Sequence, residues 1–211
     1  MRCPRLVWWR EEAARHPPRR FAGQAYWARP VPGFGDPLAR ILLVGLAPAA
    51  NGGNRTGRIF TGDPSGDFLF AALHRAGLAN QPTSTSRGDG LELNGAYIAA
   101  VNRCAPPANK PTPAERDNCL PYLGNEIAAL AQLRVIVALG AFAWDGVLRA
   151  LGPGGMVSRP RPSFAHGAQI AAGHLVMVGS FHPSQRNTNT RRLTAAMLDA
   201  VLARARRLAD E

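Results

Sequence analysis

The chain has 211 residues, of which 46% are hydrophobic, and this length and composition suit a single globular domain, residues 1–211, with a sizeable core. No apolar run approaches the length of a membrane span, and the first residues lack the apolar core of a secretion signal, so we expect a cytoplasmic protein that does not bind membranes. The formal net charge of +11 favours polyanionic partners, and DNA is the first candidate.

Arginine accounts for almost all of this positive charge, because Lys110 is the only lysine among the 25 basic residues. Arginine forms bidentate bonds to phosphate and stacks on bases, which suits a DNA-binding protein. A GC-rich genome also favours arginine codons. Charge alone therefore leaves both DNA binding and a merely solvated basic surface open.

The first 37 residues predict a helix followed by an extended arm. Residues 3–15 indicate a cysteine-headed turn and a short amphipathic helix. Residues 17–37 hold five prolines together with Phe21, Tyr26, Trp27 and Phe34. A mobile linker would leave these aromatic rings exposed, so we expect an arm packed over the domain.

The rest of the chain alternates between apolar runs of strand length and segments with helical spacing. Strands are predicted at residues 41–44, 96–101, 134–139 and 174–180. Helices are predicted from about residue 65 to 75, from the capping-box pattern at residues 112–115 to about 131, and at 140–151 and 194–208. Residues 81–90 are expected to form a variable surface loop, and residues 152–173 are rich in proline, glycine and arginine.

This alternation predicts an α/β fold, a three-layer α/β/α sandwich with a central, mainly parallel four-stranded sheet. Ligands of such sheets bind at the carboxyl ends of the strands. The segments that follow Val44, Val101 and Ser180 all leave such ends, so one pocket can collect them.

Residues 45–63 (GLAPAANGGNRTGRIFTGD) are the most informative of these segments. Five glycines permit close approach of the backbone to a ligand, and a helix that begins near Ser65 would direct its amide groups at an anion or a nucleobase. The segment lacks the Gly-Lys-Ser/Thr ending of a P-loop and the Gly-x-Gly-x-x-Gly of a dinucleotide turn. An ordinary surface loop is the alternative, although nineteen residues would be long for one.

Three further segments accompany it in order, namely residues 101–113 (VNRCAPPANKPTP), 135–140 (VIVALG) and 181–193 (FHPSQRNTNTRRL). Together the four resemble the motifs of the uracil-DNA glycosylase superfamily, family 5 (type B), and the resemblance runs from Cys3 almost to the carboxyl terminus. It implies a base-excision-repair enzyme, expected to be a monomer, that removes uracil and other deaminated or etheno-modified bases from double-stranded or single-stranded DNA.

Such an enzyme must stabilise positive charge on the sugar and negative charge on the departing base, after taking the base out of the stack. The resemblance makes Asp63 the catalytic carboxylate, which orients the attacking water or balances the charge on the sugar. The residues alone favour a helix cap for Asp63. Asp67 is the rival carboxylate, but its helical setting favours a surface role.

The resemblance assigns His182 as the donor to the base oxygen that becomes anionic, a role that a neutral imidazole can fill. Without the motif, a structural histidine would be favoured. The residues after it, Pro183, Ser184, Gln185 and Arg186, resemble the loop that enters the minor groove of DNA and fills the gap left by the flipped base.

Phe60 resembles the aromatic residue that stacks on the base, and Asn109 resembles a catalytic asparagine whose amide can offer both a donor and an acceptor to the base edge. Core packing and a turn asparagine are the respective alternatives. The first motif adds Gly45, Ala47 and Asn54 to the substrate-binding set that the resemblance implies.

Lys110 bears on the class of mechanism. Glycosylases that also cut the strand form a Schiff base through an amine, and this sequence offers one lysine and the terminal amine. We therefore expect a monofunctional enzyme that leaves an abasic site.

The cysteines depart from the family pattern, in which a four-iron, four-sulfur cluster is held by a Cys-x-x-Cys pair and two later cysteines. Cys3, Cys104 and Cys119 match three of these ligands, whereas the partner of Cys3 would fall one residue before Met1. Three thiolates make a poor closed site. We expect a native chain that begins further upstream, which the match at Arg2 and Cys3 favours, or else a form with an incomplete or absent cluster.

Asn51 is the second departure, because many relatives carry histidine there, and this change could alter which bases are accepted. Two other functions fit parts of the sequence. A catalytically idle DNA-binding module on the same fold would bind DNA without releasing a base, and a small-nucleotide hydrolase would act on free nucleosides and ignore duplex DNA.

Overall fold

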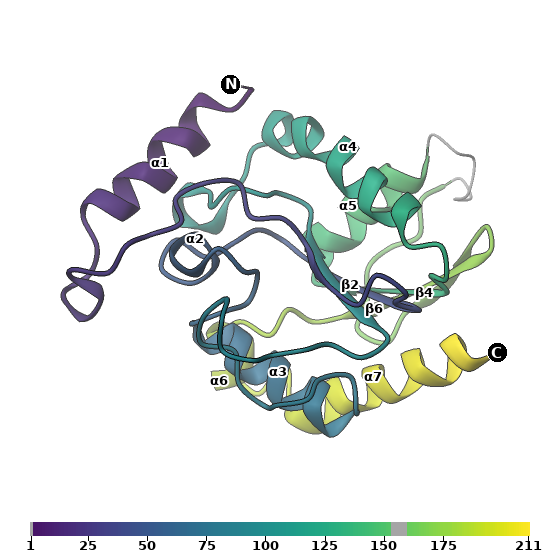
Figure 1. Cartoon of the computed structure of the whole chain (residues 1–211). Helices are drawn as coiled ribbons and strands as arrows, with labels where there is room; N and C mark the ends of the chain where they lie inside the picture. Colours follow the sequence, from purple (N-terminus) through teal and green to yellow (C-terminus); the bar gives the residue numbers. More distant parts are fainter. Residues whose placement is uncertain (1, 153–159) are drawn as a thin grey trace.

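The structure is a computed structural model that describes residues 2–152 and 160–211. A mixed sheet lies between two layers of helices (Figure 1). The three-layer α/β/α architecture and the mainly parallel sheet are therefore confirmed, but the sheet has six strands and not the four that the sequence predicts. In the described ranges, no helix is both long and apolar enough to span a membrane.

The four predicted strands form the parallel centre of the sheet. In spatial order they are β3 (Ala96–Ala100), β2 (Ile41–Gly45), β4 (Val135–Leu139) and β6 (Leu175–Ser180). Almost every residue in them is buried. Because helices cover both faces, these strands are continuous apolar runs without the alternation that a half-exposed strand would show.

Two short antiparallel strands complete the sheet in the order β1-β3-β2-β4-β6-β5. β1 (Phe34–Gly35) belongs to the proline-rich arm and pairs with β3. β5 (Gln169–Ala172) pairs with β6 through a tight turn at Gly173, whose φ is +62°. Neither has a long apolar run, which is why the sequence did not reveal them. Part of the segment 152–173, which is rich in proline, glycine and arginine, falls on residues 153–159, outside the described chain.

The long helices divide between the two faces (Figure 1). α3 (Pro64–Arg75) and α7 (Ala195–Asp210) pack on one face, and α4 (Pro113–Ala129) and α5 (Ala141–Leu151) pack on the other. α1 (Pro4–Arg15) lies beside these layers, near α4. The short helical segments are Arg19–Phe21, α2 (Gly53–Thr56), Pro107–Asn109 and α6 (Gln185–Asn189).

Local capping explains where the helices around the sheet begin. The predicted capping box is present at α4, where Glu115 N donates to Thr112 Oγ1 (3.2 Å) and Thr112 N donates to Glu115 Oε2 (2.8 Å). The same glutamate accepts two hydrogen bonds from Arg5 of α1, at 2.8 and 2.6 Å. One carboxylate therefore both starts α4 and docks α1.

The segment 81–90, expected to be a variable surface loop, is anchored by a buried ion pair. Arg58, in the glycine-rich segment, donates from Nη2 to both oxygens of Asp89 (2.8 and 2.7 Å) and to Ser84 Oγ (2.7 Å). Desolvation raises the pKa of Asp89, but the bonds from Arg58 and three backbone amides outweigh it and lower the pKa to about 2. The loop therefore holds the glycine-rich segment in place.

Replacing Asp89 by asparagine is expected to lower the free energy of unfolding by about 3 kcal/mol, because it leaves the Arg58 charge buried without a partner. The Asp89 carboxylate stabilises the wild type above its unfolded pKa and loses this effect as the pH falls through its folded pKa of about 2. Urea unfolding of wild type and variant, at neutral pH and in acid, measures the loss of stability and its dependence on pH. A variant as stable as wild type, with the same acid sensitivity, would contradict the anchoring role.

Candidate active site

The site lies where the connections of the sheet diverge. α3 follows β2 onto one face, whereas α5 follows β4 onto the other, so the carboxyl ends of these neighbouring strands form a switch point. The segment after β6 returns to the same place. A Cβ added to Gly140, at the end of β4, would lie 3.2 Å from His182 Cβ.

A cleft of about 520 Å³ opens at this point, and we call it the catalytic cleft. It brings together seven of the eleven residues predicted for catalysis, substrate binding and DNA binding. Its walls are Leu46, Ala47, Ala49, Phe60, Asp63, Ser65, Ala108, Asn109, His182, Ser184 and Arg186.

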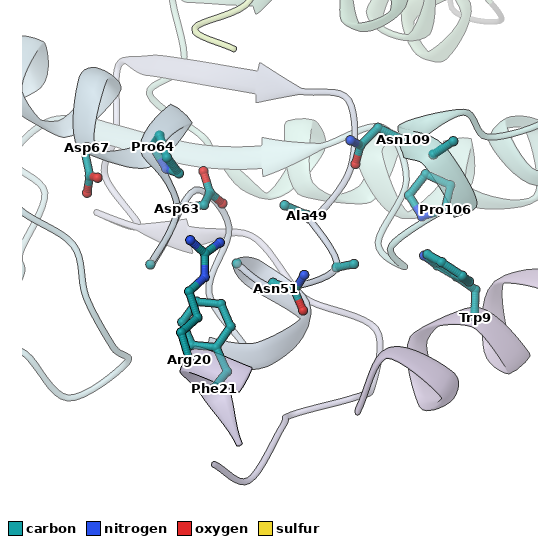
Figure 2. A pocket seen from close by; sticks show the side chains of 14 residues that line it. Trp9, Arg20, Phe21, Ala49, Asn51, Asp63, Pro64, Asp67, Pro106 and Asn109 are labelled. Carbon is teal, nitrogen blue, oxygen red and sulfur yellow. The ribbon is translucent and has the colours of Figure 1, made fainter. Parts of the chain in front are cut away.

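A second cleft, of about 570 Å³, adjoins the first and shares Ala49, Asp63, Ala108 and Asn109 with it. We call it the arm cleft, because the arm supplies Arg20 and Phe21 to its wall (Figure 2). Trp9 of α1, Asn51, Gly52 and Asp67 also line it. No sequence motif predicts this second cleft, since it joins residues that lie far apart in the chain.

Asp63 caps a helix and faces both clefts. Its Oδ1 accepts hydrogen bonds from Ser65 N (3.0 Å) and Gly66 N (3.1 Å), as the first turn of α3 requires. Its Oδ2 accepts no hydrogen bond from the described residues. Burial raises the pKa of Asp63, and the two amide bonds offset only part of this effect. The cap therefore leaves one carboxylate oxygen available, so capping and chemistry do not exclude each other.

Gly52 fits against this available oxygen. A Cβ at position 52 would overlap Asp63 Oδ2, so the carboxylate keeps its position only while residue 52 has no side chain. The five glycines of this segment predict backbone freedom and close approach to a ligand. At Gly52 the requirement is instead space for a neighbouring carboxylate.

Replacing Gly52 by alanine is therefore expected to reduce activity at least tenfold, since about 1 Å of misplacement at a reacting group can cost about a hundredfold. Gly88→Ala is the matched control, because nothing lies within 4 Å of a Cβ at that position. The measurement is the rate of base release from DNA by each variant. Equal rates for the two variants would contradict the packing of Gly52 on Asp63.

His182 projects from the end of β6 and is half-buried. Desolvation lowers its pKa to about 4, so the imidazole is neutral at physiological pH. Within residues 2–152 and 160–211, no group forms a hydrogen bond with its ring. Asn187 Nδ2 donates to the His182 carbonyl oxygen (2.8 Å) and fixes the backbone from α6. Asn187 is a positioning residue that the sequence analysis did not single out.

Phe60 lies beside His182, with ring centroids 5.7 Å apart. Its φ of +54° is unusual for a bulky residue, and such strain is common at functional sites. Two glycines make room for it: a Cβ on Gly45 would lie 2.8 Å from the Phe60 ring, and a Cβ on Gly66 would overlap the Phe60 carbonyl oxygen. Gly45 thus supports the aromatic wall from behind and does not line either cleft.

Asn109 is exposed and lines both clefts. It and Ala108 adopt positive φ angles of +54° and +52°, which asparagine tolerates better than most residues. This backbone turns the segment between α4 and β3 toward Asp63, as Figure 2 shows. The turn role and the pocket role, which the sequence posed as alternatives, coexist at Asn109.

The predicted DNA-binding residues lie at the edge of the catalytic cleft. Ser184 and Arg186 line it, whereas Gln185 is exposed outside it and Pro183 is buried. The hydroxyl of Ser184 caps α6 by accepting from Asn187 N (3.4 Å). Of the residues expected to enter DNA, Gln185 and Arg186 therefore begin a short helix, Ser184 caps it, and Pro183 precedes it.

Asn54 lies outside both clefts, contrary to its expected place in the substrate-binding set. It is only 1% exposed, and its amide donates to Arg10 O (3.0 Å) and Ala50 O (3.3 Å). It therefore joins α2 to α1. Asn51, by contrast, lines the arm cleft and accepts a hydrogen bond from Tyr26 Oη (2.9 Å).

The three cysteines gather where α1 meets α4. Burial raises the pKa of Cys104 and Cys119, and each of the other thiols contributes to the shift at Cys119. Arg10 Nη1 donates to Cys104 Sγ (3.3 Å). In the described parts of the chain, however, no group of three or more Cys, His, Asp or Glu side chains is arranged to hold a metal ion. The three thiols match three of the four ligands that the family resemblance implies for an iron–sulfur cluster, and we assign no chemical step to one.

A family model described as the uracil DNA glycosylase superfamily matches residues 32–206, a range that holds the whole sheet and the catalytic cleft. The chain therefore belongs to this superfamily.

Within the superfamily, relatives that match almost the whole chain carry the name Type-5 uracil-DNA glycosylase. The protein of Mycobacterium leprae is 55% identical over 210 residues, which cover 98% of this chain and 90% of the relative. That of Thermus thermophilus is 51% identical, covering 98% and 92%. That of Pyrobaculum aerophilum is 48% identical, covering 97% and 86%. The family resemblance seen in the four sequence motifs is thus confirmed over nearly the full chain.

Proposed function

We propose that this protein is a monofunctional DNA glycosylase of base excision repair that hydrolyses the N-glycosidic bond of uracil in DNA. The observation that carries this proposal is the meeting of Asp63, His182, Asn109 and Phe60 in one cleft at the carboxyl ends of the strands. The names of relatives about 50% identical over almost the whole chain support it.

In the proposed reaction the flipped base enters the catalytic cleft and stacks on Phe60. The bond between the base and the sugar breaks with its electron pair going to the base. His182 donates a hydrogen bond to the base oxygen that gains negative charge, and it does so as a neutral imidazole. The side-chain amide of Asn109 forms hydrogen bonds with the edge of the base.

Asp63 acts on the sugar side of the breaking bond. Its negative charge stabilises the cationic sugar, and its Oδ2 accepts a proton from the water that attacks the sugar carbon. A raised pKa makes a carboxylate a better base for this purpose. The products are an abasic site and the base, which leaves as an anion and takes up a proton from solvent, while Asp63 returns its proton to solvent.

Two features support the finer parts of the proposal. Lys110, the only lysine, does not line either cleft, which disfavours strand cleavage through a Schiff base. The small side chains of Ala47 and Ala49 in the catalytic cleft, and its opening into the arm cleft, leave room for larger deaminated or etheno-modified bases.

The test is incubation with a labelled duplex that carries one U·G pair, followed by analysis with and without hot alkali. We expect free uracil and strand breaks that appear only after alkali. Breaks without alkali would contradict the monofunctional mechanism. Binding without uracil release would favour the idle DNA-binding module, and release from deoxyuridine but not from DNA would favour a nucleoside hydrolase.

The iron–sulfur cluster and the monomeric state are separate proposals that rest on the family resemblance alone. Iron and sulfide content of protein purified without oxygen tests the first, and sedimentation tests the second. Protein without iron that still releases uracil would show that the chemistry needs no cluster.

A further inference from the structure

Beside the arm cleft lies a set of arginines stacked on aromatic rings. Arg20 and Arg55 lie 4.8 and 4.2 Å from the centroid of Phe21. Arg87 and Arg29 lie 4.6 and 5.8 Å from the ring of Trp27. We call these residues the arginine stripe: Arg20, Phe21, Trp27, Arg29, Arg55 and Arg87.

The two stacks are joined and lead into the arm cleft. Trp27 N donates to Arg55 O (2.9 Å), which links the second stack to the first. Arg55 in turn donates from Nη2 to Gly62 O (3.0 Å). Gly62, Arg20 and Phe21 all line the arm cleft, and Asp63 forms another part of its wall (Figure 2). The stripe therefore connects Trp27 to the arm cleft, whose wall includes the proposed catalytic carboxylate.

The stripe carries positive charge that the described parts of the chain do not neutralise. No acidic side chain there forms an ion pair with any of its four arginines. Arg55 donates only to neutral oxygens, those of Asn51, Gln24 and Gly62. Two arginines stacked elsewhere differ, because Arg58 pairs with Asp89 and Arg103 pairs with Glu126.

We propose that the arginine stripe binds the sugar–phosphate backbone of the DNA strand where it leaves the catalytic cleft past Asp63. This inference rests on the proposed function, because it requires the damaged strand to lie in that cleft. Stacking holds each guanidinium plane in place, and a guanidinium binds phosphate through two parallel hydrogen bonds. The arm thus contributes an extension of the DNA site that residues 183–186 begin.

The test uses a duplex with a tetrahydrofuran abasic analogue at its centre, which the enzyme cannot cleave. Fluorescence anisotropy at several salt concentrations gives the dissociation constant and its salt dependence. Arg20→Ala and Arg87→Ala are each expected to weaken binding about fivefold at about 0.15 M salt, and to lower the slope of log K against log salt by about 0.9, the effect of one phosphate contact. Both side chains are exposed, and melting curves check that the variants fold.

Arg207→Ala is the matched control, because it removes the same charge from an exposed position on α7. It should bind within twofold of wild type. Arg20→Lys keeps the positive charge but cannot stack a planar guanidinium on Phe21. Its affinity for the duplex should lie between those of wild type and Arg20→Ala. If Arg20→Ala and Arg87→Ala bind DNA with the same affinity as Arg207→Ala, the position of the arginines does not matter and the stripe proposal is wrong.

Shortening the duplex from one end at a time identifies the part of the DNA backbone that contacts the arginine stripe. The difference between wild type and Arg87→Ala should vanish when the DNA is trimmed on one side of the analogue and persist when it is trimmed on the other. Persistence under both trims would contradict the proposed path. Because binding is measured with an uncleavable analogue, failure of the stripe is distinguishable from failure of the glycosylase function, which uracil release by the wild type tests.

Discussion

Replacing Asp63 by asparagine is expected to lower the rate of uracil release by about 10²–10³-fold while the protein remains as stable as wild type. Asparagine is as good a helix cap as aspartate, so the hydrogen bonds from Ser65 N and Gly66 N can persist. The substitution removes only the charge and the basic oxygen. Single-turnover excision and thermal unfolding measure the two effects separately.

The comparison with Asp63→Ala separates the cap from the chemistry. Alanine removes both the helix cap and the carboxylate. Asp63→Ala should therefore lose as much activity as Asp63→Asn and also lower the free energy of unfolding by about 1 kcal/mol. Asp67→Asn, which alters the rival carboxylate in the first turn of α3, should lower the rate less than tenfold. If Asp63→Asn keeps a rate within a few-fold of wild type, Asp63 is a cap and nothing more.

The acid limb of the activity profile is a further readout of Asp63. Burial raises its pKa, and only the ionised form can balance the sugar charge, so wild-type activity should fall as the pH drops through that raised pKa. This limb should be missing from the residual activity of Asp63→Asn. A limb that persists unchanged would belong to another group.

Replacing His182 by alanine is expected to lower the rate by at least about 100-fold with little change in DNA affinity, because the lost hydrogen bond strengthens as the base becomes anionic. His74→Ala, at an exposed position on α3, is the matched control and should be as active as wild type. A loss of affinity that accounts for the whole decrease would instead indicate a binding role for His182.

The protonation state of His182 gives a second, independent check. Because desolvation lowers its pKa to about 4, the ring stays neutral from about pH 5.5 to about pH 8, and its titration should not alter the rate in that range. An imidazole that held its proton to neutral pH would give a rate that falls as the pH rises. Imidazole chemical shifts across the same range report the charge directly.

Stability should respond to the same shift. The unfolded chain binds a proton at His182 below about pH 6.5, whereas the folded protein binds it only near pH 4, so the free energy of unfolding falls as the pH is lowered between these values. Above about pH 6.5 neither state carries the proton, and the effect disappears. In His182→Ala this part of the acid sensitivity should be absent.

The centre of the fold follows from the sequence because its strands are continuous apolar runs, as at Val135–Leu139. The edge strands do not, since β1 is two residues long and both edges depend on pairing with a neighbour for their structure. Likewise the capping box at Thr112 is a local pattern and is visible in the sequence, whereas the ion pair between Arg58 and Asp89 joins residues 31 positions apart.

The same distinction applies to the site. The motifs name Asp63, His182 and Phe60, but they do not say that Gly52 must lack a side chain for Asp63 to keep its place, or that Asn187 holds the His182 carbonyl. Nor do they place Arg20 beside Asp63, because contact between the arm and the glycine-rich segment depends on the whole fold. Asn54, which the resemblance assigns to the substrate-binding set, lies outside both clefts, and its burial in the contact with α1 shows only in three dimensions.

Attempts to make this protein more heat-resistant would meet an obstacle at Gly66. A glycine inside a helix is an obvious choice for exchange to alanine, which helix propensity alone would reward with about 1 kcal/mol. Here the added methyl group would collide with the Phe60 carbonyl and push the aromatic wall out of the cleft. Gly124, with open space around it in α4, is the safer position for the same exchange.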